Sequence, residues 1–201
     1  MDTLFADTST ALHLSWLITS LPPSLPCSLR QALISILETR PVHTYQQSAT
    51  LERLVGKPSG LVDFGGLSRT EVRGQCAMIL ETVRRLLHGV EYAAVLARFA
   101  PTEASMRVGV SRLADYLDVA SPLGSRDALE ALIWRRYVPN RYRNGYALRA
   151  IEARTGVPRS TLARTYKWLD GECSGFERRA LLRIEDALVA QGVCAAGSAR
   201  T

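Results

Sequence analysis

The stretch TGVPRSTLARTYKWL, residues 155–169, concentrates hydrogen-bond donors at helical spacing. Leu162, Tyr166 and Leu169 recur every three or four residues and predict the buried stripe of a helix. The opposite face of that helix carries donors and small side chains, namely Arg159, Ser160, Ala163, Arg164 and Lys167. An arginine can donate two hydrogen bonds to the edge of a guanine, and a serine adapts to several base edges. These residue types at this spacing therefore suit a helix that lies in the groove of a nucleic acid.

The residues before this helix supply the other parts of a helix-turn-helix. Leu148 and Ile151 predict the inward face of a short first helix. Gly156 provides the left-handed conformation that a sharp turn needs, and Val157 fills the corner between the two helices. Pro158 falls at the start of the second helix, where a missing amide is harmless. The motif turn is therefore predicted at Gly156 and Val157.

The start of a recognition helix usually contacts bases, and its later turns usually contact phosphates. We therefore assign base contacts to Arg159, Ser160 and Arg164, and a backbone contact to Lys167. Thr161 is either a further contact or a flank of the packing face. Additional backbone or groove contacts are assigned to basic residues of the lead-in and first helix, namely Arg135, Arg136, Arg141, Arg143 and Arg149. The tyrosines among them are expected to pack on the helices.

A plain corner between two amphipathic helices is the alternative interpretation. Against it stands the relative spacing of Ile151, Gly156, Val157 and Leu162, which all fall where a helix-turn-helix requires them. The basic and aromatic lead-in IWRRYVPNRYRNGY, residues 133–146, also favours a nucleic-acid site. We therefore interpret the segment as a helix-turn-helix.

The segment LRAIEARTGVPRSTLARTYKWL resembles the helix-turn-helix of bacterial transcription regulators and of sigma-factor region 4. Its first helix has Glu152 where those motifs usually have alanine, so either Ala153 takes that place or Glu152 pairs with a neighbouring arginine. The segment GLSRTEVRGQCAMI, residues 66–79, is similar to small helical proteins of bacterial prophages, some of which regulate late genes or act as antiterminators. The zinc-binding cysteine pairs of one antiterminator family are absent.

The rest of the sequence predicts an all-α fold. Expected helices run from a cap at Ser9 or Thr10 to Ser20, from Ser28 to about Thr39, from the capping box Ser68–Glu71 to His88, over 91–99, over 107–117, and from the cap Ser125 to just before Pro139. A second capping box, Ser174–Glu177, predicts a separate closing helix over 176–191 that ends at Gly192. The expected domains are an N-terminal extension with one or two short helices and a linker (1–66), a helical scaffold (67–137), the helix-turn-helix domain (138–194) and a frayed tail (195–201).

Charge is concentrated around the motif. The chain has 25 basic and 19 acidic residues and a formal net charge of +6. Residues 126–167 hold ten basic side chains and three acidic ones, so the remainder of the chain is close to neutral. A local excess of this kind favours an acidic partner such as DNA.

No group in the sequence predicts catalysis, a metal or a cofactor. The four cysteines and three histidines are scattered, and Cys76 is expected to be a small core residue. The acidic residues show no grouping that would hold a catalytic metal, and no glycine-rich phosphate loop is present. The apolar run 11–21 is too short to cross a bilayer and lacks a basic flank, which predicts a cytoplasmic protein without membrane contact.

The expected function is therefore sequence-specific binding of double-stranded DNA in transcription regulation, without enzymatic activity. A homodimer is expected because one recognition helix contacts too few base pairs for useful specificity. RNA polymerase is a possible partner, as for an antiterminator. The alternatives are a fragment of a recombinase or transposase, and a helical protein-interaction module with a basic face.

Overall fold

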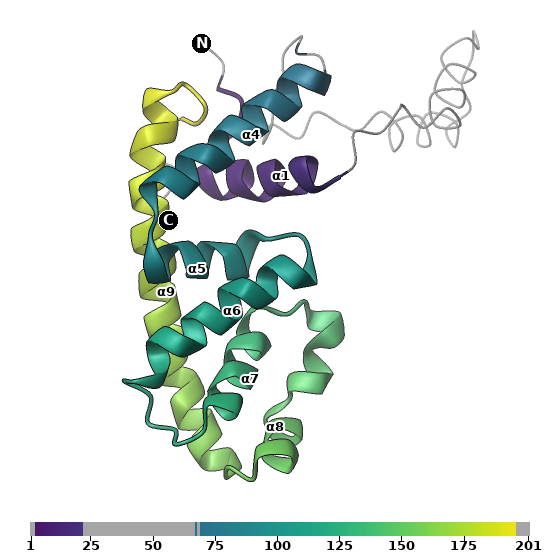
Figure 1. Cartoon of the computed structure of the whole chain (residues 1–201), viewed down its shortest axis with the longest axis vertical. Helices are drawn as coiled ribbons and strands as arrows, with labels where there is room; N and C mark the ends of the chain where they lie inside the picture. The colour runs from purple at the N-terminus through teal and green to yellow at the C-terminus, as the bar shows by residue number, and fades with distance from the viewer. Residues whose placement is uncertain (1–2, 22–66, 68, 196–201) are drawn as a thin grey trace, which may run out of the picture.

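The fold is all-α, as the sequence predicts. The computed structural model describes residues 3–21, 67 and 69–195 (Figure 1). This part contains seven α-helices and one 3-10 helix, and its only β feature is an isolated bridge between Phe5 and Cys194. The elements are α1 (Thr8–Ser20), α4 (Arg69–Leu86), α5 (Gly89–Phe99), α6 (Glu103–Asp118), α7 (Arg126–Tyr137), η1 (Asn140–Tyr146), α8 (Leu148–Thr155) and α9 (Arg159–Ala190).

The long helix α9 runs along one side of the molecule and contacts elements at both ends (Figure 1). Its first turns lie beside α7 and α8, and its last turns lie beside α1 and α4. The sequence predicts a break near Ser174. This prediction is wrong, because α9 is a single helix of 32 residues that continues through that position. Gly171 and Gly175 both keep negative φ values, so neither ends the helix. The positive φ of +70° at Gly192 occurs just after the helix, where the sequence predicts its end.

Two hydrophobic clusters form the core, and α5 and α9 contribute to both. The lower cluster in Figure 1 joins α6, α7 and α8 to the first half of α9 through Leu162, Leu169 and Phe176. The upper cluster joins α1 and α4 to the second half of α9 through Ile184 and Leu188. One buried stripe along α9 therefore connects the two cores. Cys76 lies fully buried in the upper cluster, which confirms its predicted place in the core.

The packing of α5 against α6 depends on small residues. A Cβ atom built on Gly109 would lie 2.6 Å from the backbone nitrogen of Ala97 and 2.7 Å from the carbonyl oxygen of Ala93. Both neighbours are backbone atoms of α5, which cannot move aside as a flexible side chain could. Only glycine at position 109 therefore allows this approach.

Several helix boundaries differ from their predicted positions. The cap of α1 is Asp7, whose carboxylate accepts the amide of Thr10 at 2.8 Å. Thr102 caps α6, which begins at Glu103, four residues before the predicted start. The helix predicted to run to His88 ends at Leu86, and α5 begins at Gly89, two residues before its predicted start.

Other predictions are confirmed or fall outside the described part. Ser125 caps α7 as expected, since its hydroxyl accepts the amide of Ala128. The proposed cap at Ser68, the helix predicted over 28–39, the linker predicted within the N-terminal extension and nearly all of the C-terminal tail lie outside the described residues. The predicted domain boundaries remain predictions. Among the described residues, no helix is both long enough and apolar enough to cross a membrane.

We predict that Gly109→Ala lowers the free energy of unfolding by about 1–3 kcal/mol, because the added methyl group must push α5 and α6 apart. Urea denaturation followed by circular dichroism measures this change. Gly74→Ala is the control, since no atom lies within 4 Å of a Cβ at that position. Equal stability of the two variants would contradict the described packing of α5 on α6.

We predict that Gly171→Ala raises the free energy of unfolding by about 0.5–1 kcal/mol, because alanine favours the interior of a helix over glycine. A Cβ at position 171 also meets no neighbour within 4 Å. The same denaturation experiment measures the effect. A neutral or destabilising result would argue for a break in α9 at this glycine.

Candidate nucleic-acid interface

The predicted helix-turn-helix is formed by α8, the turn at Gly156 and the first turns of α9. Gly156 ends α8 in the left-handed conformation, with φ +71°. Ile151 of α8 and Leu162 of α9 are fully buried in the lower cluster, and Val157 packs against it from the corner. The turn at Gly156 and the buried positions of Ile151 and Leu162 are therefore as the sequence predicts.

Hydrogen bonds between side chain and backbone hold the turn. The hydroxyl of Thr155 donates to the carbonyl of Ile151 at 2.8 Å and accepts the amide of Val157 at 3.5 Å. The carboxylate of Glu152 accepts the backbone amide of Arg159 at 2.9 Å. A carboxylate in this position satisfies one of the open amides at the start of α9 and complements the positive end of the helix dipole.

The unusual Glu152 is explained by this contact. Ala153 is exposed, so it does not take the place of the usual alanine against the second helix. The sequence also suggested a pair between Glu152 and a neighbouring arginine. Among the described residues, Glu152 forms no ion pair with an arginine side chain; its carboxylate binds the backbone amide of Arg159 instead.

The side chains assigned to DNA contact on α9 lie on its solvent face. Arg159, Ser160, Arg164 and Lys167 are all exposed, and Thr161 is half-buried at the flank. On the inner face, Leu162 and Leu169 are buried as predicted, whereas Tyr166 is only half-buried. Thr165 is buried instead, a position that the apolar pattern could not indicate because threonine is polar.

The basic residues of the lead-in divide into two groups. Arg143 on η1 and Arg149 on α8 are exposed, and the side chain of Arg141 lies outside the described part. Arg135 is turned toward the protein, where it donates to the carbonyl of Tyr146 at 3.0 Å and lies 5.5 Å from the ring centre of Tyr166. Arg135 therefore helps to hold η1 and α9 in place.

Arg136 is also turned inward and belongs to a buried ionic network. Its guanidinium donates to the carboxylate of Glu177 at 3.1 Å and to the hydroxyl of Ser174 at 3.0 Å, and it also pairs with Asp170. The side chain of Arg136 is 15% exposed and that of Glu177 is 5% exposed. The sequence predicts that Ser174 and Glu177 cap a separate helix. Both instead bind Arg136, which precedes them by 38 and 41 residues in the chain.

Glu177 accepts two further partners. Arg98 of α5 pairs with its second carboxylate oxygen, and the hydroxyl of Tyr137 donates to its first at 2.7 Å. Burial strongly raises the pKa of Tyr137, so this phenol stays protonated and keeps donating. The network joins α5, α7 and α9 at one point, and it fixes the rotation of α9 about its own axis.

The positive side chains near the motif lack the carboxylate or carbonyl partners that most arginines in the rest of the described part have. Over the rest of the described part, most arginines bind carboxylates or backbone carbonyls: Arg73, Arg84, Arg98, Arg107, Arg126, Arg179 and Arg183. Among the described side chains, no carboxylate lies within ion-pair distance of Arg143, Arg149, Arg154, Arg159, Arg164 or Lys167. Arg85, Arg112 and Arg178 share this property but lie on other elements or farther along α9. The α8–α9 end therefore carries uncompensated positive charge.

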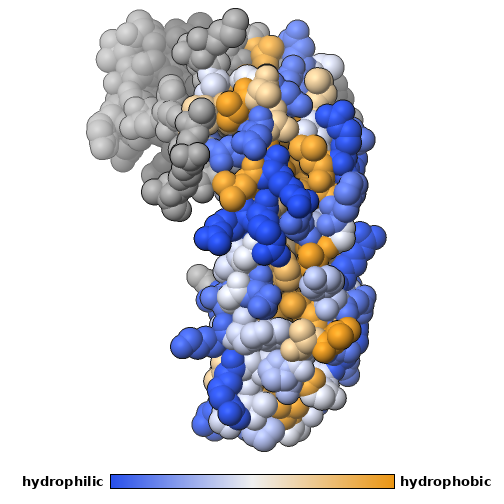
Figure 2. Space-filling view, turned by 90° about the vertical axis from the view of Figure 1, so that its left-hand side faces the viewer, coloured by the Kyte–Doolittle hydropathy of each residue, from blue (hydrophilic) through white to orange (hydrophobic). Residues whose placement is uncertain are grey.

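The hydrophobic side chains of the visible surface are dispersed, and the described thiols are buried. Figure 2 shows hydrophobic side chains in small patches that hydrophilic ones separate, on the side of the molecule that faces the viewer there. Among the described residues, no three His, Cys, Asp or Glu side chains come together as a metal site. Cys173 and Cys194 are buried, and burial raises the pKa of each to about 11, so both thiols are protonated near neutral pH.

Comparison with known proteins gives no match to a family model and no match among curated proteins.

We predict that Glu177→Gln lowers the free energy of unfolding by about 3 kcal/mol. This is the low end of the range for breaking a buried ion pair, because the side chain of Arg98 stays partly solvated. Guanidinium chloride denaturation measures the loss. Glu172→Gln, an exposed change on the same helix, should stay within about 0.5 kcal/mol of the parent protein. If Glu177→Gln were as stable as Glu172→Gln, the network would have no structural role.

Proposed function

We propose that this protein binds double-stranded DNA sequence-specifically and regulates transcription in the cytoplasm. The observation that carries the proposal is the coincidence of two features at one end of the molecule. One is a helix-turn-helix held by Gly156 and Glu152, and the other is a set of positive side chains without acidic partners among the described residues. Phosphate binding by such side chains releases counterions from DNA and provides sequence-independent affinity.

The start of α9 is the part that would enter the major groove. Arg159, Ser160 and Arg164 would contact base edges, and Lys167 would contact a phosphate on the later turns. Thr161 is half-buried, so it would flank the contact and support the helix. These roles follow from the exposure of the side chains and from their order along the helix.

The flanking phosphate contacts are proposed for a smaller set than the sequence suggests. Arg143 and Arg149 are exposed and keep their proposed role, and Arg154 of α8 joins them. Arg135 and Arg136 are not included, because the first binds a backbone carbonyl and the second is paired with Glu177. Replacing either arginine would disturb the fold, so a loss of DNA binding in such a variant would not identify a contact with DNA.

A homodimer on DNA fits this proposal. A single recognition helix contacts few base pairs, and two helices on neighbouring half-sites would supply the specificity that a genome demands. The half-sites would then be related by twofold symmetry.

We predict that the full chain selects a defined sequence from a pool of random duplexes and that Arg159→Ala/Arg164→Ala abolishes this preference. Fluorescence anisotropy with the selected duplex and a scrambled duplex measures both. The logarithm of the binding constant should fall with the logarithm of salt concentration by about 0.9 for each phosphate neutralised. The double variant should keep weak, salt-sensitive binding to both duplexes.

Arg85→Ala/Arg178→Ala is the matched control, since it removes the same charge from exposed arginines of α4 and of a later turn of α9 that have no ion pair with a described residue. It should keep the preference for the selected sequence. The proposal fails if the parent protein binds no duplex at about 0.15 M salt. It also fails if the control variant loses as much specificity as Arg159→Ala/Arg164→Ala.

A further inference from the structure

A row of four exposed side chains lies along the outer face of α6 and the residue that follows the helix. The row consists of Val108, Arg112, Asp115 and Val119, and we call it the α6 row. Val119 follows the last residue of α6 but keeps a helical backbone, with φ −63° and ψ −35°. The spacing of four, three and four residues places all members on one side of the helix. Val108 is 45% exposed and Val119 is 94% exposed, so both ends of the row present an apolar side chain to solvent.

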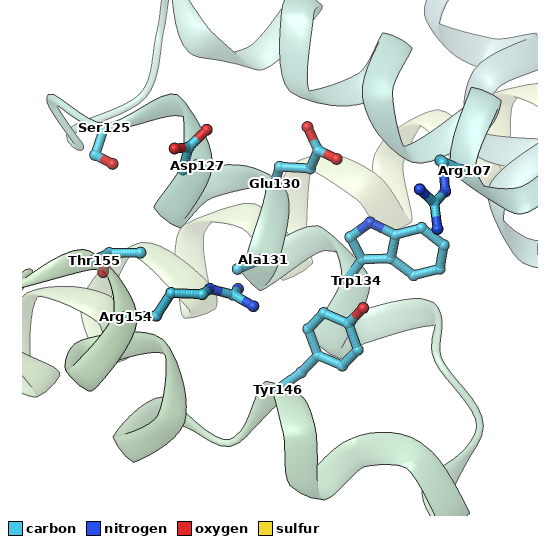
Figure 3. Close-up of a pocket in the computed structure, with 9 residues that line it drawn as sticks. All are labelled: Arg107, Ser125, Asp127, Glu130, Ala131, Trp134, Tyr146, Arg154 and Thr155. Atoms are coloured by element: carbon cyan, nitrogen blue, oxygen red, sulfur yellow. The ribbon is translucent and has the colours of Figure 1, made fainter.

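The described part of the fold packs against the other side of α6. Figure 1 shows α6 between α5 and α7, and the side chains that α6 buries there are Val110, Leu113, Ala114 and Leu117. A polar pocket also opens between α6, α7, η1 and α8 (Figure 3). Of the α6 residues, Arg107 alone lines this pocket. The α6 row is therefore part of neither the core nor the pocket.

The two charged members of the row can bind a partner from outside the chain. Within the described part, Arg112 has no ion pair. Asp115 binds the guanidinium of Arg126, and both hydrogen bonds go to the same carboxylate oxygen, Oδ1. No described residue donates to the second oxygen, Oδ2, and the side chain of Asp115 is 62% exposed. Each copy of the chain thus offers one positive and one negative group on this face.

The order of the four residues makes the α6 row complementary to itself. From either end, the row presents a valine, a charged residue, a residue of the opposite charge and a second valine. If two rows lie antiparallel, Val108 faces Val119 of the second copy. Arg112 then faces Asp115 of the second copy, and the twofold symmetry repeats both contacts. A parallel pair would instead place Arg112 against Arg112, so charge complementarity favours the antiparallel arrangement.

We propose that the α6 row is the interface of a homodimer, in which the α6 helices of two copies pack antiparallel. The spacing of four, three and four residues is also that of side chains that interlock between paired helices. Tyr116, which is 58% exposed, flanks the row and adds apolar area to the contact. One pair of helices buries less surface than a standard protein–protein interface, so we expect a Kd of about 10–100 µM.

The dimer supplies the second recognition helix that specific binding to DNA requires. A duplex with two half-sites would bind both copies, so its apparent affinity would exceed that of a duplex with one half-site. This consequence rests on the proposed function, whereas the pairing of the two α6 rows does not.

The test is sedimentation equilibrium of the full chain without DNA. We expect the parent protein to dimerise, and Arg112→Glu and Asp115→Lys each to weaken self-association at least about tenfold, because each creates two contacts between like charges. An equimolar mixture of these two variants should form a heterodimer about as tightly as the parent dimerises. In the mixed pair the new glutamate faces the new lysine, and the two unchanged residues still face each other. Misfolded variants could not show this recovery.

Arg85→Glu and Asp186→Lys are the matched controls, because they reverse exposed charges on α4 and α9 that have no ion pair with a described residue. Each should dimerise as the parent does. The proposal is overturned if the parent is monomeric at about 500 µM, where a Kd of about 100 µM would give mostly dimer. It is also overturned if the α6 variants dimerise like the controls, or if their mixture associates no more tightly than either alone. Because DNA is absent, failure of DNA binding leaves these outcomes unaffected.

Discussion

The structure depends on the continuity of the buried stripe along α9. Leu162 and Leu169 belong to the lower core, whereas Ile184 and Leu188 belong to the upper core. A break in this helix would leave the helix-turn-helix attached to the rest of the molecule mainly through α7. The buried carboxylate of Glu177 lies between the two halves of the stripe and binds partners from α5 and α7. Hydrophobic burial sets which side of α9 faces inward, and the ionic network fixes its rotation, so Arg159 and Arg164 face solvent.

The distribution of positive charge follows from the same arrangement. Arginines between helices are used to neutralise buried acids, as Arg136 does with Glu177 and Arg183 does with Glu91. Burying a carboxylate without such partners would be strongly unfavourable. At the α8–α9 end the core is apolar, with Ile151 and Leu162 fully buried, and the carboxylate of Glu152 accepts a backbone amide. The arginines there remain open to a partner from outside the chain.

Local sequence patterns correctly predict those features of the fold that depend on residues close together in the chain. The cap at Ser125, the turn at Gly156 and the apolar face of α8 were predictable because each depends on residues three or four positions apart. The break at Ser174 was predicted wrongly for the same reason. Ser174 and Glu177 have the spacing of a capping box, but both bind Arg136, which is distant in sequence. The inward orientation of Arg135 depends on the position of η1, which no periodic pattern indicated.

Amide hydrogen exchange of the free protein and of its complex with the selected duplex tests the central claim most directly. Because the first amides of α9 have no intrahelical partner, their exchange responds to a ligand bound at the helix start. We predict slower exchange in the complex over η1, α8 and the first three turns of α9, with no change in α1 and α4. A duplex that binds specifically but protects α1 and α4, and leaves the start of α9 unchanged, would contradict the assignment of α9 as the helix that contacts DNA.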